Sequence, residues 1–91
     1  MQIQFLKSFE KSLKKLNSPD RIKTGKAVSG LLDAFETSVY PKGLGLKKLG
    51  DHFHEIRVTI KIRVLFYVES GVIKLVLVGN HDDIKRSLKT R

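Results

Sequence analysis

His81 and Arg63 are two residues whose types could together act on a phosphodiester. An imidazole ordinarily titrates near neutral pH, so His81 could act as a general base or as a general acid. The guanidinium of Arg63 carries a permanent charge in a planar fork that matches phosphate oxygens. Cleavage of RNA through the ribose 2′-hydroxyl needs a base, an acid and a cation for the charge that grows on the phosphate. Together these two residues predict a site that could cleave RNA without a metal ion.

Further residues could hold RNA on either side of this pair. Four cations could bind the backbone: Lys47, Lys48, Arg57 and Lys61. Tyr67 or Phe53 could stack a base. Solvated strand faces also often carry arginine, so Arg57 and Arg63 are equally compatible with an ordinary surface.

A metal site is less well supported by the sequence. His52 and His54 would point to the same side of a strand, near Asp51, and Asp82 and Asp83 follow His81. However, the His-x-His pair has no matched second pair of ligands, which favours ordinary hydrogen-bonding histidines. Motifs for nucleotide hydrolysis, redox chemistry and metalloprotease chemistry do not occur. We therefore expect neither a metal ion nor a cofactor.

Charge and length limit the classes of protein further. The chain has 18 Lys and Arg against 9 Asp and Glu, a net charge of +9, which favours nucleic acid or an acidic protein segment as partner. Its 91 residues predict one domain over 1–91, and the lack of cysteine excludes disulfides and thiolate zinc sites. The apolar runs are too short to span a bilayer and no signal-peptide pattern is present, so we expect a cytoplasmic protein without membrane contact.

The first half of the chain has helical periodicity. Ile3 and Phe5 could form a short strand, and an amphipathic helix is expected from Ser8 to about Asn17. A second helix should begin at Ser18-Pro19-Asp20, with Ser18 as the N-cap. Its expected buried stripe is Ile22, Val28, Leu31, Leu32 and Phe35. The short turn between the helices predicts a helical hairpin, and Tyr40–Gly50 is interpreted as a basic, functional loop.

The second half of the chain has β-strand character. Residues 53–68 are too long for one strand and should fold back around Thr59–Lys61, which places Arg57 opposite Arg63. A second tight turn at Ser70-Gly71 would give four pairs: Phe66 with Leu75, Tyr67 with Lys74, Val64 with Leu77, and Arg63 with Val78. His81 follows Val78 by three residues, so it should be a neighbour of Arg63.

These registers divide the predicted sheet into two faces. The inner face would cover the helices with Ile56, Val58, Val64, Phe66, Val68, Ile73, Leu75 and Leu77. The outer face would carry Arg57, Arg63, Tyr67 and Lys74. Asp82 or Asp83 could cap a last short helical turn containing Ile84 and Leu88. The predicted fold class is α+β, with an N-terminal helical hairpin packed on a twisted antiparallel sheet.

Four segments in this order resemble the RelE/ParE toxin superfamily of type II toxin–antitoxin systems: 45–49, 54–58, 62–68 and 79–84. The resemblance implies the α+β fold above and, in the RelE-like branch, endoribonuclease cleavage of mRNA on the ribosome, which inhibits translation. In the YafQ-like branch a Gly-x-His-x-x-aliphatic segment supplies a catalytic histidine, which here is His81. The central-strand arginine falls on Arg63, and the Glu-Ile-Arg of HigB-like toxins falls on 55–57. The paired lysines on the second strand of the RelE prototype fall on His54 and Ile56 here, and His54 is a further candidate for RNA binding.

The resemblance also implies a partner and leaves one alternative. A small cognate antitoxin should wrap the protein with an extended or helical acidic segment. The ParE branch shares the fold but poisons DNA gyrase without cleaving RNA, and a plain basic nucleic-acid-binding module is a further possibility. The predicted proximity of His81 and Arg63 favours the ribonuclease.

Overall fold

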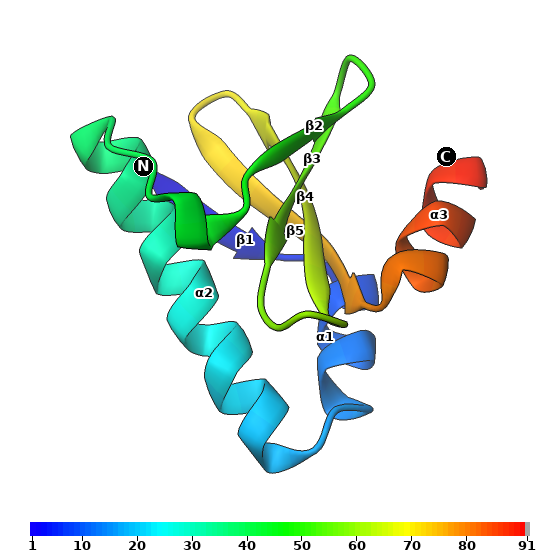
Figure 1. The fold of residues 1–91 in the computed structure, drawn as a ribbon. Coiled ribbons are helices and arrows are strands. Elements are labelled where there is room, and N and C mark those ends of the chain that lie inside the picture. The colour runs from blue at the N-terminus through cyan, green and yellow to red at the C-terminus, as the bar shows by residue number, and fades with distance from the viewer. Residues whose placement is uncertain (91) are drawn as a thin grey trace.

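The computed structural model describes residues 1–90, which form three α-helices, one 3-10 helix and a five-stranded sheet (Figure 1). In chain order the elements are β1 (Gln2–Phe5), α1 (Lys7–Lys14), α2 (Ser18–Thr37), η1 (Lys42–Leu44), β2 (Lys47–Leu49), β3 (Phe53–Arg57), β4 (Arg63–Glu69), β5 (Val72–Gly79) and α3 (His81–Lys89). The strand order is β1-β5-β4-β3-β2. The predicted α+β class is confirmed.

Two edge strands differ from the expected antiparallel sheet. β1 forms as Ile3 and Phe5 suggested, but it pairs in parallel with β5. β2 lies within the segment that we expected to be a loop, and it pairs antiparallel with β3. Lys47 and Lys48 therefore lie on a strand, which directs their side chains to opposite faces of the sheet.

The start and the buried stripe of α2 also differ from expectation. The N-cap is Asn17, whose side chain accepts a hydrogen bond from the Asp20 backbone N–H at 2.9 Å, so the expectation of Ser18 is wrong by one residue. Ile22 is 62% exposed and does not belong to the stripe. The buried positions begin at Thr24 and continue at Val28 and Leu31, so they are four and then three residues apart, as on one face of a helix. Ile22 lies two residues before Thr24 and therefore points away from this face.

The β3–β4 hairpin has the predicted register. Arg57 lies opposite Arg63 and Ile56 lies opposite Val64. The turn is held by the Thr59 hydroxyl oxygen, which accepts hydrogen bonds from the backbone N–H groups of Lys61 and Ile62 at 3.2 and 3.0 Å.

The β4–β5 hairpin follows the predicted register only near its turn. The pairs of Phe66 with Leu75 and of Tyr67 with Lys74 are confirmed, but an irregularity follows between Leu65 and Phe66. Beyond it Leu65 lies opposite Leu77, so the extra residue on β5 is Val76, which makes this a β-bulge. The predicted pairs of Val64 with Leu77 and of Arg63 with Val78 are therefore wrong. The partners of Val64 and Arg63 are Val78 and Gly79.

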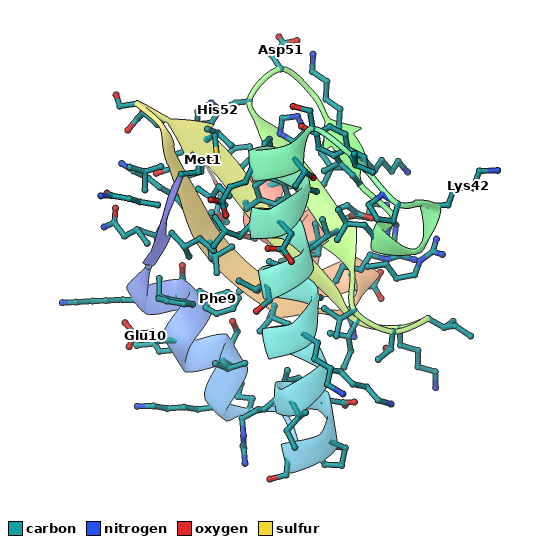
Figure 2. The ribbon with its side chains drawn as sticks, turned by 90° about the vertical axis from the view of Figure 1, so that its left-hand side faces the viewer. Met1, Phe9, Glu10, Lys42, Asp51 and His52 are labelled. Carbon is teal, nitrogen blue, oxygen red and sulfur yellow. The ribbon has the colours of Figure 1, made fainter. Side chains whose placement is uncertain are left out.

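Each face of the sheet has an apolar core. The larger core lies against α1 and α2 and includes Phe9, which points from α1 toward α2 (Figure 2). The smaller core lies under α3, on the opposite side of the sheet from α2 (Figure 1). It contains Leu65, Val76 and Ile84, and Leu77 packs against it rather than in the inner core that we expected. The outer face is thus partly apolar because α3 covers it.

Candidate functional site

His81 and Arg63 line the same pocket. This open pocket of about 250 Å³ lies where β4 begins and α3 begins. Its lining residues are Ile60, Lys61, Arg63, Asn80, His81 and Asp82. The structure therefore brings three of the predicted site residues together: His81, Arg63 and Lys61. His81 is exposed, so its imidazole can meet a ligand from solvent.

The start of α3 is held in place by a capping box around Asn80. The Asn80 side chain accepts from the Asp83 backbone N–H at 2.8 Å, and Asp83 Oδ2 accepts from the Asn80 backbone N–H at 3.0 Å. The N-cap is thus Asn80, so the expectation of Asp82 or Asp83 as the cap is wrong, and Asp83 completes the box from the third position of the helix. A Cβ on Gly79 would lie 2.6 Å from Asp83 Oδ2, so only glycine allows this approach. The box determines where His81 stands relative to β5.

Arg63 has a buried carboxylate partner that our sequence reasoning did not identify. Arg63 Nη1 lies 3.4 Å from Glu55 Oε2, and the Glu55 side chain is only 7% exposed. Cross-strand pairing puts Glu55, Leu65 and Arg63 on one face of the sheet. The ion pair holds the guanidinium at the pocket, while the fork keeps further N–H donors for a ligand. A buried glutamate in a strand gives little signal in sequence, since most glutamates are exposed.

Two more predicted cations share this face. Lys47 lies opposite Glu55 on the edge strand β2, and Arg57 lies opposite Arg63. Arg57 does not line the pocket with His81. It lines a separate groove against α2 and η1. Gly45 approaches Arg57 so closely that a Cβ on Gly45 would lie 2.8 Å from Arg57 Cβ.

Lys48 and His54 lie on the opposite face, away from His81. They form a cross-strand pair, and the His54 ring stacks on Phe66 with centroids 5.5 Å apart. His54 Nδ1 is buried without a hydrogen-bond partner among residues 1–90. Burial lowers the pKa of His54, and the charges of Lys48 and then His52 lower it further. The neutral form of His54 is therefore favoured, and its ring packs on Phe66. The structure does not place His54 in the pocket.

Tyr67 and Phe53 belong to an aromatic cluster at the other end of β4. The Tyr67 ring lies 4.6 Å from the His52 ring and 5.6 Å from the Phe53 ring, measured between centroids. Lys74 Nζ lies 5.8 Å from the centroid of Tyr67. Four residues of strand separate Tyr67 from Arg63, roughly 13 Å at about 3.3 Å per residue. A base stacked on this cluster would thus belong to a nucleotide some distance from the pocket.

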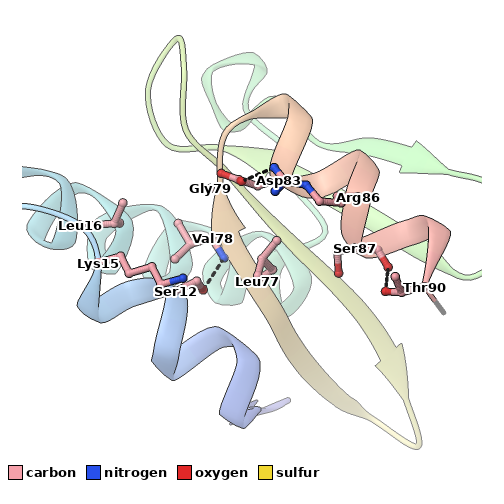
Figure 3. A pocket seen from close by; sticks show the side chains of 10 residues that line it. All are labelled: Ser12, Lys15, Leu16, Leu77, Val78, Gly79, Asp83, Arg86, Ser87 and Thr90. Carbon is pink, nitrogen blue, oxygen red and sulfur yellow. Dashed lines mark hydrogen bonds and ion pairs between the residues drawn. The ribbon is translucent and has the colours of Figure 1, made fainter.

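A larger groove lies on the other side of α3. It has a volume of about 410 Å³ and separates α1 from α3 across the end of β5 (Figure 3). Ser12 accepts a hydrogen bond from the Val78 backbone N–H at 3.0 Å on one wall, and Arg86 pairs with Asp83 at 3.0 Å on the other. This groove holds no histidine.

Residues 1–90 contain neither a cluster of metal ligands nor a membrane-spanning helix. Over residues 1–90, no three His, Asp or Glu side chains gather as a metal ion would require. Among the helices of the same range, none has the length and apolar character to cross a membrane. The pocket at His81 offers an imidazole and the cations Arg63 and Lys61. A phosphate placed there would meet Arg63 and Lys61, with an imidazole beside it to move a proton.

Comparison with known proteins finds similarity in structure only. No protein-family model matches the sequence, and no curated protein matches it significantly. RelE in the RelB–RelE antitoxin–toxin complex from Methanococcus jannaschii superimposes with a TM-score of 0.68 at 19% identity, over 91% of this chain and 95% of that one. YafQ from E. coli strain BL21(DE3) gives 0.66 at 12% identity, over 91% and 96%. YoeB from Staphylococcus aureus gives 0.64 at 18% identity, over 89% and 97%. The chain therefore has the fold of the RelE, YafQ and YoeB toxins of type II toxin–antitoxin systems.

Proposed function

We propose that this protein is the toxin of a type II toxin–antitoxin system and that it inhibits translation by cleaving mRNA on the ribosome. The observation that supports the proposal most is the pocket that His81, Arg63 and Lys61 share. The fold of RelE and YafQ supports it as well, because the pocket lies in a chain with that architecture. The protein would act in the cytoplasm, where ribosomes translate.

The proposed reaction is a transesterification that needs no metal ion. The ribose 2′-oxygen attacks the adjacent phosphorus, the bond to the 5′-oxygen of the next nucleotide breaks, and a 2′,3′-cyclic phosphate and a 5′-hydroxyl remain. His81 moves a proton, either from the attacking 2′-hydroxyl or to the leaving 5′-oxygen. Arg63 stabilises the charge on the pentacoordinate phosphate, and Lys61 adds a second cation. Lys47 binds the RNA backbone on the same face of the sheet as Arg63, and Arg57 binds it from the groove against α2.

The proposed partner is a cognate antitoxin with an acidic binding segment. RelE from Methanococcus jannaschii and YafQ from E. coli were both crystallised with their antitoxins, RelB and DinJ. The net charge of +9 suits an acidic segment, which would also shield the pocket from RNA.

Expression of three variants in cells followed by mapping of mRNA ends tests the function. The wild type should arrest growth and produce new mRNA ends on ribosome-bound messages, and His81→Ala should lose both effects. His52→Ala is the matched control, because His52 is equally exposed but lies in the aromatic cluster. Full cleavage by His81→Ala would exclude His81 from the reaction. Growth arrest by the wild type without new mRNA ends would contradict the nuclease, and a gyrase supercoiling assay would then test the ParE-like alternative.

A further inference from the structure

A second basic groove lies between α2 and η1, on the α2 side of the sheet, whereas the cleavage pocket lies on the α3 side. Its volume is about 420 Å³, and its walls come from α2, from the segment around η1 and from the end of β3. Its apolar surface comes from Ala27, Pro41, Leu44 and Val58, and its cations are Lys23, Lys26 and Arg57.

The three cations of this groove have no acidic partner. Lys23 and Lys26 are three residues apart on α2, so both lie on one side of the helix. Neither they nor Arg57 form an ion pair with any Asp or Glu of residues 1–90. Arg57 also lies directly opposite Arg63, an unfavourable pair of like charges, and Glu55 pairs only with Arg63. An anion bound in the groove would offset this uncompensated charge.

Glycines shape the groove. Gly45 has φ +63°, and its missing Cβ lets the segment after η1 approach Arg57, one of the residues that line the groove. Gly30 and Gly43 line the groove without side chains and leave it open. A Cβ on Gly30 would meet Leu44 Cδ1 at 3.8 Å, an ordinary contact, so a larger side chain there would extend into the space.

The groove and the cleavage pocket flank the same turn. Arg57 and Val58 line the groove on one side of the β3–β4 turn, and Ile60, Lys61 and Arg63 line the pocket on the other. Arg57 and Arg63 are cross-strand partners, so their backbones are only about 5 Å apart. A chain that leaves the pocket over this turn therefore reaches Arg57 next and then the lysines of α2.

We propose that this groove, formed by α2, η1 and Arg57, binds the single-stranded RNA next to the scissile bond. This inference rests on the proposed function. Single-strand sites combine cations that follow the backbone with apolar surfaces that accept bases, and the groove has both. The position of both sites at the β3–β4 turn favours RNA over an acidic protein segment, because only the RNA has to pass through the pocket. Lys23 and Lys26 contact phosphates, and a base lies against the apolar wall.

Affinity for uncleavable RNA of two lengths tests the groove. The probes are 2′-O-methyl RNAs of about four and about twelve nucleotides, short enough to fill the pocket alone or long enough to extend beyond it. The Lys23→Gln/Lys26→Gln protein should bind the longer RNA more weakly, and its salt slope should fall by about 1.4, or about 0.7 per phosphate contact. Its affinity for the shorter RNA should equal that of the wild type. Lys11→Gln/Lys14→Gln is the matched control, because these lysines are also exposed and three residues apart, but lie on α1.

A second variant fills the groove without changing its charge. Gly30→Leu should weaken binding of the longer RNA several-fold and leave the shorter one unaffected, while thermal unfolding reports whether the protein remains folded. If Lys23→Gln/Lys26→Gln or a folded Gly30→Leu protein binds the longer RNA as the wild type does, the groove is not an RNA site. This outcome is distinct from failure of the proposed function, which would show as a wild type that cleaves no RNA in cells.

Discussion

Arg63 and Glu55 form an ion pair across the outer face of the sheet, with 3.4 Å between Nη1 and Oε2. The glutamate is almost wholly buried, whereas the arginine side chain keeps 22% of its surface exposed at the pocket. Within this pair the carboxylate is part of the protein interior, whereas the guanidinium faces solvent. The same guanidinium that neutralises a buried carboxylate is available to a ligand.

Removing Arg63 should therefore cost stability as well as activity. Arg63→Met leaves the Glu55 carboxylate buried without its partner, and we expect a loss of about 2 kcal/mol in the free energy of unfolding, since an unpaired buried charge is costly. Adding Glu55→Gln should recover most of that stability but no RNA cleavage. Urea unfolding of the wild type, the two single variants and the double variant gives the coupling free energy between the two side chains. Additive effects of the two substitutions would show that the pair contributes nothing to the fold.

Glu55→Gln alone should leave the protein folded but slow the reaction. The amide keeps the shape of the side chain but loses the charge that holds the guanidinium, so Arg63 becomes less ordered at the pocket. We expect roughly a tenfold lower cleavage rate, since small misplacements of a catalytic group are expensive. The rate is measured on ribosome-bound mRNA. A rate equal to that of the wild type would show that Arg63 is positioned without Glu55.

The same substitution at two glycines should have opposite effects on stability. In Gly79→Ala the new Cβ would overlap Asp83 and disrupt the capping box of α3, at a cost of about 2 kcal/mol. In Gly25→Ala, on the exposed side of α2, the new Cβ meets nothing within 4 Å, and stability should rise by up to about 1 kcal/mol. Thermal unfolding compares the two. A Gly79→Ala protein as stable as the wild type would show that the box is not essential to α3.

Acid should weaken the fold through His54. Because burial lowers its pKa in the folded protein, the unfolded chain binds a proton more readily, so stability rises with pH. The contribution of the neutral ring is complete above the ordinary histidine value of 6.5 and is lost as the pH falls toward the lower folded value. His54→Phe should gain about 1 kcal/mol by removing the unpaired Nδ1. Its stability should also fall less steeply with acid. Equal slopes in the two proteins would exclude this role for His54.

Neighbouring lysines on β2 should differ in their effect on RNA binding. Lys47 lies on the face of Arg63, whereas Lys48 lies on the opposite face beside His54. Lys47→Gln should therefore lower the salt slope of RNA binding by about 0.7, and Lys48→Gln should leave it unchanged. The two variants carry the same net charge, so each controls for the other. Equal losses would mean that RNA binding depends on overall charge rather than on the face.

The sequence predicted the β3–β4 register because a slip of one residue there would turn its apolar side chains to the wrong face. It did not predict the bulge at Val76, since Val76 and Leu77 are both apolar and either could face a core. The same error left Leu77 in the wrong core. Edge strand β2 was missed although β3 follows it after only three residues, because its sequence Lys-Lys-Leu lacks the β-branched and aromatic side chains that are typical of strands.

At the site, His81 and Arg63 were predicted as neighbours although the register beyond the bulge was wrong. The shift of one residue puts Gly79, rather than Val78, opposite Arg63, which brings α3 closer to the pocket. Glu55 and the groove lysines were not predicted as parts of sites, because they depend on how α2 and η1 lie against the sheet. That Lys47 and Lys48 point to opposite faces of the sheet was also not predicted, because this orientation requires β2 to be a strand.

The parallel pairing of β1 with β5 has a consequence for protein synthesis. Residues 2–5 are synthesised well before residues 72–75, which are their hydrogen-bonding partners. This edge of the sheet therefore cannot form until residues 72–75 have been made. β5 also carries Gly79, the cross-strand partner of Arg63, and leads directly into His81. Contacts this distant in sequence form late, because the intervening chain must first be ordered. A nascent chain therefore has no assembled pocket until residues 80–82, which complete its lining, have left the ribosome.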